Sequence, residues 1–236
     1  MLPLNGTPVP LRVDGGYAQF MVDTTTPRPE GRTAPPRPGG RTAAVRAAVL
    51  TATEDALIDA GFASIDLSAI AAAAGVGKTT VYRRWGTPEA LVADLLREMA
   101  TQSVSATRTG NLADDLLANA RLVVDTLRDR RQGPLFGALI AAATGDDRTR
   151  DALAEFYRTR VSEWASCVDD AIVRGDIPDD TDTSAVIRSV SAPLYYLMLT
   201  GVRTPTEHDA RVAVDATLAA LDAGVFSTDT VRTDTP

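Results

Sequence analysis

Most of this chain repeats apolar side chains at the three- and four-residue spacing of an α-helix. The repeat begins near Thr42, and glycines such as Gly61, Gly110 and Gly175 interrupt it. It continues in five later segments, which are 111–130, 134–143, 147–174, 182–200 and 206–223. No stretch shows a competing strand pattern. The sequence therefore predicts an all-α fold, and an apolar content of 44% suffices for packed helices.

The two ends of the chain differ from its middle. Residues 1–40 hold eight of the 14 prolines and six of the 17 glycines, so we predict a flexible arm there and a flexible tail at 226–236. The net charge of −7 excludes uniform attraction to nucleic acid. However, residues 1–86 have a charge balance of +2 and residues 87–236 one of −9. Any polyanion should therefore meet the N-terminal part.

Cysteine, histidine and acidic residues give no sign of catalysis or metal binding. The single cysteine, Cys167, rules out an internal disulfide and lies in a helical pattern that favours a structural role. The single histidine, His208, lies in the polar stretch TPTEHDA, where a surface or capping role fits best. We predict a protein that is not an enzyme and binds no metal or cofactor. No apolar run approaches the ~20 residues that cross a bilayer, and the reducing cytoplasm is the expected compartment.

The stretch AAAAGVGKTTVYRRWG, residues 71–86, contains a Gly-Lys-Thr like the end of a nucleotide-binding phosphate loop. Such a loop needs a further glycine where Ala72 stands, and it follows a buried strand, whereas IDLSAIAAAA favours a helix. A nucleotide-hydrolysing enzyme is therefore disfavoured. The same residues fit two short helices, LSAIAAAA and KTTVYRRW, joined by a glycine turn, which is a helix-turn-helix.

The inward positions of this motif carry residues that suit them. Ala71 is small where the second helix crosses the first, and Gly75 supplies the positive φ of the turn. Val76 and Val81 face the core, and Asp66 is placed to cap the first short helix.

The outward positions of the second helix are polar, and half of them are basic. They are Lys78, Thr79, Thr80, Tyr82, Arg83 and Arg84. Such a surface is suited to the major groove of DNA, where side chains reach base edges and phosphates together. After it, Thr87-Pro88-Glu89 is typical of a helix start, and we expect that helix to run to about Thr107.

Taken together, these residues resemble the TetR family of transcriptional repressors. The resemblance lies in IAAAAGVGKTTVYRRWGTPEALV, residues 70–92, after a first helix that ends in AGFASIDLSAI, and it is specific over 41–95. It is looser beyond, where SAPLYYLMLTG and VDATLAALDAGVF are similar to the family's last two helices. It implies a DNA-binding domain at 41–86 and a ligand-binding and dimerisation domain at 87–225. One departure is Pro88, where members often have a lysine that can touch the DNA backbone.

The resemblance implies roles for the outward residues. Lys78, Thr79 and Tyr82 would contact base edges and nearby backbone, and Thr80 and Arg84 would hold phosphates. Arg83 belongs to the same surface, and two arginines near the first helix, Arg41 and Arg46, are further phosphate candidates. Three arginines of the arm form either a minor-groove contact or a solvated tail, and these are Arg28, Arg32 and Arg37.

The resemblance also implies a homodimer that presents two reading helices, about 34 Å apart, to a palindromic double-stranded DNA operator. The apolar stripes of 182–200 and 206–223 would form its interface, although a monomer core could use the same residues. The predicted interface residues are Ile187, Val190, Leu194, Met198, Val212, Leu218 and Leu221.

Finally, the resemblance implies a small apolar or aromatic effector that shifts the spacing of the reading helices. The predicted pocket residues, each of which could instead be ordinary core, are Met99, Phe136, Leu139, Phe156, Tyr157, Trp164, Tyr195 and Tyr196. The alternative function is a helical small-molecule-binding or interaction protein whose DNA-reading head is weak or unused.

Overall fold

The computed structural model describes residues 40–102 and 106–228, so the arm residues Arg28, Arg32 and Arg37 lie outside the described part. Within the described ranges the chain forms nine α-helices and one short 3-10 helix. Extended pairing there is limited to an isolated bridge between Thr181 and Ser227. The all-α class predicted from the sequence is confirmed.

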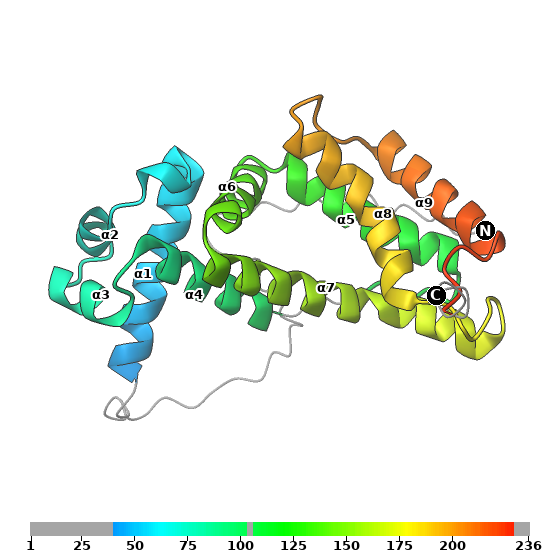
Figure 1. Cartoon of the computed structure of the whole chain (residues 1–236), viewed down its shortest axis with the longest axis horizontal. Helices are drawn as coiled ribbons and strands as arrows, with labels where there is room; N and C mark the ends of the chain where they lie inside the picture. The colour runs from blue at the N-terminus through cyan, green and yellow to red at the C-terminus, as the bar shows by residue number, and fades with distance from the viewer. Residues whose placement is uncertain (1–39, 103–105, 229–236) are drawn as a thin grey trace, which may run out of the picture. The chain divides into compact units, whose positions relative to one another are not determined.

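The first part of the fold contains the predicted helix-turn-helix (Figure 1). Its elements are α1 Gly40–Ala60, the 3-10 helix η1 Phe62–Ser64, α2 Leu67–Ala73 and α3 Lys78–Arg84. The Asp66 carboxylate accepts hydrogen bonds of 3.1 Å from the backbone N–H groups of Ser68 and Ala69, as expected of an N-cap. Gly75 adopts a φ of 67°, so the turn between α2 and α3 uses the left-handed conformation that glycine tolerates best.

Six further helices follow, and α7 packs along both α4 and α8. They are α4 Pro88–Thr101, α5 Leu112–Arg128, α6 Gln132–Gly145, α7 Asp147–Arg174, α8 Thr183–Leu199 and α9 Glu207–Asp222. Figure 1 shows α4 and α6 beside the N-terminal half of α7, while α5, α8 and α9 gather near its C-terminal half.

Helix α4 is shorter than the sequence predicts. It ends at Thr101, and Gln102 is extended, whereas the apolar pattern suggested a helix to about Thr107. Two contacts fix the segment that leads into α5. The Thr109 N–H donates to a carboxylate oxygen of Asp115 at 2.7 Å, and Arg108 pairs with Asp170 on α7.

The sequence also places the start of the predicted flexible C-terminal tail too early, at residue 226. The Asp182 N–H donates to the Phe226 carbonyl at 2.8 Å, and the Thr228 N–H donates to the Asp180 carbonyl at 2.8 Å. Phe226 also packs against buried residues of the C-terminal helices. Phe226–Thr228 are therefore bound to the loop before α8, and the prediction of a flexible tail from residue 226 is wrong for these three residues.

The buried apolar residues form two clusters. The first core joins α1–α4, α6 and the N-terminal half of α7, from Val49 to Phe156. The second core joins α5, the C-terminal half of α7, α8 and α9, from Leu112 to Leu221. The helix-turn-helix thus shares its core with α4 and α6, and the domain boundary predicted after residue 86 does not coincide with a break in packing.

Candidate nucleic-acid interface

Helix α3 is held in place by three buried side chains. Val81 and Ala71 have no exposed surface, so α3 packs directly on α2 at this point. Trp85, directly after α3, is 8% exposed and belongs to the first core. Burial of these apolar groups fixes one face of α3 and leaves the other toward solvent.

The solvent face of α3 carries the residues that the sequence predicted. Lys78, Thr79, Arg83 and Arg84 are exposed, and Thr80 is half-buried. Tyr82 is 47% exposed, and its hydroxyl lies 3.3 Å from the Ser68 hydroxyl of α2. This hydrogen bond joins the two helices of the motif at the surface. Sequence reasoning missed Ser68, although its place one residue after the start of α2 was the available signal.

Arg84 is oriented by its neighbour in the chain. Its guanidinium carbon lies 5.0 Å from the centre of the Trp85 ring, which suits a cation–π contact. The ring contact therefore orients an exposed guanidinium, which is a favourable starting point for a phosphate contact.

Arg46 does not fit its predicted role as a phosphate contact. Its guanidinium donates two hydrogen bonds of 3.0 Å to the Asp94 carboxylate on α4, and it also pairs with Glu98. The bond to Asp94 raises the pKa of Arg46 above its usual value, against the opposing effect of burial. Arg46 is therefore engaged within the chain, where it ties α1 to α4.

Asp94 is the centre of this internal network. Besides Arg46 it accepts a hydrogen bond of 2.9 Å from the Trp85 indole N–H. Burial alone would raise the pKa of Asp94, but the bonds from Arg46 and Trp85 outweigh it and hold the pKa below the usual 3.8. The network connects α1, the end of α3 and α4. It escaped the sequence reasoning because Arg46 and Asp94 are 48 residues apart and only tertiary packing brings them together.

Two further sequence predictions concern the edges of this surface. The backbone of Arg41 lies in α1, but its side chain is outside what the structure describes. At the start of α4 the Thr87 hydroxyl accepts a hydrogen bond of 3.2 Å from the Ala90 N–H, and Pro88 occupies the first turn, as predicted.

All but one of the predicted pocket residues are divided between the two cores. Four of them, Met99, Phe136, Leu139 and Phe156, are buried in the first core. Phe136 and Phe156 begin a row of ring contacts that continues through Tyr157 to Tyr195, with centroids 5.3–5.8 Å apart. Burial raises the pKa of both tyrosines.

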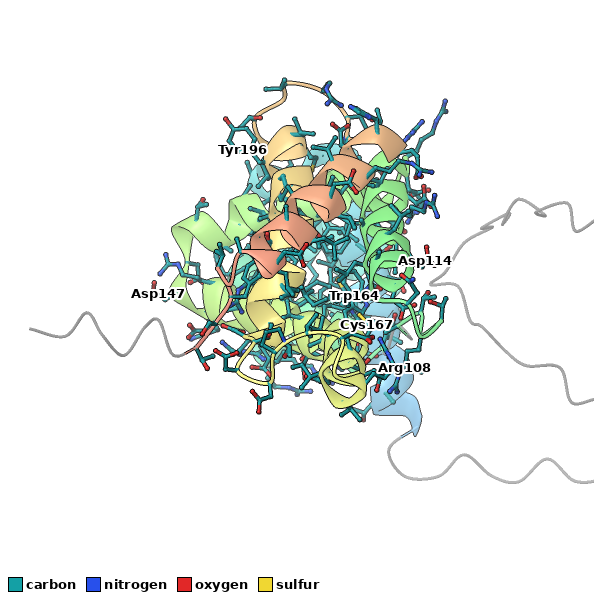
Figure 2. All side chains as sticks on the ribbon, turned by 90° about the vertical axis from the view of Figure 1, so that its right-hand side faces the viewer. Arg108, Asp114, Asp147, Trp164, Cys167 and Tyr196 are labelled. Carbon is teal, nitrogen blue, oxygen red and sulfur yellow. The ribbon has the colours of Figure 1, made fainter. Side chains whose placement is uncertain are left out.

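The other two predicted pocket residues have opposite surroundings. Tyr196 is 64% exposed at the margin of the bundle, so it lines no enclosed space within its own chain (Figure 2). Trp164 lines a narrow void between α5, α7 and α8. A separate, open concavity of about 500 Å³ lies between α1, η1 and α6, and none of the predicted pocket residues lines it.

The predicted dimer residues also divide into two groups. Ile187, Val190, Leu194 and Leu221 are at most 6% exposed and belong to the second core of their own chain, so they are not free to form an interface. Met198 and Leu218 are half-buried, and Val212 is 50% exposed. The sequence could not separate these groups because apolar side chains also occupy exposed positions of α8 and α9, such as Tyr196 and Val212.

Several absences hold for residues 40–102 and 106–228. No helix there has the length and apolar character needed to cross a membrane, and no group of three or more His, Cys, Asp or Glu side chains is arranged to hold a metal ion. Cys167 is a buried free thiol, and burial raises its pKa to about 11. A thiol in this state is a packing residue and not a nucleophile.

Comparison with known proteins assigns this architecture to one family. Residues 49–95 match the family "Bacterial regulatory proteins, tetR family", and residues 106–217 match "Tetracyclin repressor-like, C-terminal domain". The uncharacterized HTH-type transcriptional regulator YdeS of Bacillus subtilis is 29% identical over 160 residues, which are 65% of this chain and 78% of that protein. The DNA-binding transcriptional repressor TetR of Mycobacteroides abscessus is 27% identical over 75% of this chain and 94% of its own length.

Solved structures agree with the sequence relatives. A TetR transcriptional regulator from Agrobacterium tumefaciens superposes with a TM-score of 0.57 and 24% identity, over 81% of this chain and 98% of that structure. The exposed face of α3, the buried residues beneath it and the two matching segments lead to one conclusion. This chain belongs to the TetR family of transcriptional regulators, which bind DNA and are not enzymes.

Proposed function

We propose that this protein is a ligand-responsive repressor that binds a palindromic DNA operator as a homodimer, and that a small-molecule effector releases it. The observation that carries the proposal is the exposed face of α3, where Lys78, Arg83 and Arg84 project from a helix whose other face is fixed by Val81. The repressor named among its relatives supports repression as the mode of regulation. The compartment that we infer is the cytoplasm, where the DNA is.

Within this proposal the side chains of α3 divide into two kinds of contact. Lys78, Thr79 and Tyr82 read base edges, because they occupy the first two turns of a helix that enters the major groove. Thr80 and Arg84 hold phosphates, which fix the helix in register without carrying sequence information. Arg46 takes no part, because Asp94 and Glu98 already bind its guanidinium.

The test of base reading is sequence preference. Binding of the purified protein to fragments of its own upstream DNA, and to fragments with single base-pair changes, is measured by fluorescence anisotropy. Lys78→Ala and Thr79→Ala should each lose about 1–3 kcal/mol of discrimination at one base-pair position. Arg130→Ala, which removes an exposed charge elsewhere, is the control and should keep the parent's preference. Unchanged preference in both α3 variants would reject α3 as the reading helix.

The dimer is proposed to form through the exposed apolar residues of α8 and α9 instead of the buried ones. Tyr196 and Leu199 on α8 are 64% and 51% exposed, and Val212 on α9 is 50% exposed. Tyr196→Glu should convert the dimer to a monomer in sedimentation experiments and weaken operator binding, because one helix-turn-helix buries little DNA surface. Val173→Glu, at an 86% exposed position near the end of α7, should remain dimeric. A dimeric Tyr196→Glu variant would contradict this interface.

A further inference from the structure

The Trp85 ring contacts both a partly buried carboxylate and an exposed arginine. Its indole N–H donates to the Asp94 carboxylate at 2.9 Å, and the Arg84 guanidinium carbon lies 5.0 Å from the centre of the same ring. The residue is 8% exposed, and its backbone N–H donates to the Val81 carbonyl at 2.9 Å. The ring therefore connects a phosphate candidate on the surface to the interior of the fold.

Asp94 is held by two helices, α1 and α4, which pack against each other (Figure 1). Its neighbours on α4, Ala93 and Leu95, are buried in the first core. From α1, Arg46 donates hydrogen bonds of 3.0 Å to both carboxylate oxygens, and one of these, Oδ2, also accepts the Trp85 N–H. Because both oxygens have partners, the orientation of the carboxylate is fixed, and with it the direction in which the indole N–H must point.

Arg83 and Arg84 are neighbours on α3, and they differ in what supports them. Both side chains are exposed, and neither forms an ion pair within the described part of the chain. Arg84 lies against the Trp85 ring, whereas Arg83 has no hydrogen bond or ring contact among the described residues. A guanidinium that already rests on a ring loses less conformational entropy when it binds a phosphate. Arg84 is therefore the better prepared of the two.

We propose that Asp94 is a positioning residue for DNA binding, because its bond to the Trp85 N–H fixes the ring that sets where the Arg84 guanidinium meets a phosphate. This inference rests on the proposed phosphate contact of Arg84 and adds the residues that position it. In Trp85→Phe a ring still fills the core, but no N–H is left to bind the carboxylate. Packing alone then holds that ring, and Arg84 approaches the phosphate from a wider range of positions.

A purely structural role for Asp94 would have other consequences. Arg46→Ala removes two bonds to Asp94 and lowers stability, yet it leaves the Trp85 N–H its acceptor. Asp94→Asn also keeps an oxygen that can accept this N–H, whereas Asp94→Ala does not. The contribution of Arg84 to DNA binding should therefore follow the bond between positions 85 and 94, and it should not follow the stability of the variant.

The test is a double-mutant cycle on DNA binding by the full-length protein. Arg84→Ala and Trp85→Phe are made singly and together. Affinity for a fragment of the upstream DNA is measured by fluorescence anisotropy, at a temperature at which circular dichroism shows every variant to be folded. Arg84→Ala should weaken binding about tenfold in the parent and only about threefold or less in Trp85→Phe, where much of the phosphate contact is already lost. The matched cycle with Arg83→Ala should be additive.

Further variants test Asp94 itself. In Asp94→Ala the loss caused by Arg84→Ala should shrink as it does in Trp85→Phe, and in Asp94→Asn it should return to about tenfold. Arg46→Ala and Trp164→Phe are controls that should keep the parent's loss. The first is a destabilised variant, and the second is the same substitution at a tryptophan of the second core. If Asp94→Ala does not fold, the cycle with Trp85→Phe decides.

The possible outcomes separate this inference from the proposed function. If Arg84→Ala costs the same factor in the parent and in Trp85→Phe, the ring does not position Arg84, and the inference is overturned while the phosphate contact stands. If Arg84→Ala binds DNA like the parent, the phosphate contact is absent and both fall. A loss that shrinks in Arg46→Ala as well would show a general loosening of the fold and would also overturn the role of Asp94. A loss that shrinks only without the bond between positions 85 and 94 supports it.

Discussion

Buried polar groups are hydrogen-bonded in both the first and the second core, with one exception in the second. In the first, Thr53 donates to the Val49 carbonyl at 2.8 Å, and Thr149 donates to the Glu89 carbonyl and to its own cap, Asp146. In the second, Thr217 donates to the Ala213 carbonyl at 2.8 Å and Asp115 accepts from the Thr109 hydroxyl at 2.8 Å, whereas the Trp164 N–H has no partner among the described residues. The first core therefore holds the reading helix with every one of these polar groups paired, and the second, as far as the structure describes it, contains a single unpaired donor.

The largest expected effect comes from a cavity in the first core. Leu96 is completely buried on α4, so Leu96→Ala should cost about 3 kcal/mol of unfolding free energy in urea titrations. Because the helix-turn-helix shares this core, it should unfold in the same transition in which the whole chain loses its helix content. Val173→Ala, at an exposed position, should be nearly neutral. A separate transition for residues 40–86 would break the comparison.

The ion pair that joins α1 and α4 should give the next largest effect. Arg46→Ala leaves Asp94, whose side chain is 21% exposed, without its main partner, and we expect a loss of about 2 kcal/mol. Arg131→Ala removes a pair with Asp55 whose side chains are 52% and 50% exposed, so that loss should be below about 1 kcal/mol. Equal losses in the two variants would show that the Arg46 network is ordinary surface pairing.

The same substitution at the two tryptophans compares the cores directly. Trp85→Phe removes a hydrogen bond to a carboxylate and should cost about 1.5 kcal/mol or more in the unfolding free energy. Trp164→Phe removes an unpaired donor, so stability should change by less than about 0.5 kcal/mol. If Trp164→Phe proved the more costly of the two, the indole N–H would have a partner in solution and the contrast would fail.

The smallest effect is a pH dependence of the first core. Because the pKa of Asp94 is held below 3.8 in the folded state, its ionised form stabilises the fold above that pH. This contribution begins to decline as the pH falls below about 4, and it is lost once the pH passes the lowered pKa. In thermal unfolding between about pH 5 and pH 2.5, Asp94→Asn should therefore show a shallower fall in stability than the parent. Parallel curves would assign the acid sensitivity to other carboxylates.

The sequence predicted local features well and tertiary ones poorly. Caps such as Asp66 and Thr87, the turn at Gly75 and the exposed face of α3 depend on residues close in the chain, and the structure has them as expected. The ion pair between Arg46 and Asp94 depends on how α1 and α4 pack together, and no spacing of residues along the sequence predicts it. For the same reason the apolar stripes of α8 and α9 indicated an interface but could not show that Ile187 and Leu194 face their own core.

The claim that α3 binds DNA is tested most directly by the salt dependence of operator binding. For the parent, affinity should fall steeply as salt rises, because phosphate contacts release counterions. Arg84→Ala should weaken binding to all sequences about equally and reduce the slope of log affinity against log salt concentration by about 1. Arg130→Ala should have the same slope as the parent protein. So should Arg46→Ala, measured under conditions in which that variant is folded. A parent slope in Arg84→Ala, or a reduced slope in Arg46→Ala, would contradict this account of the DNA-binding surface.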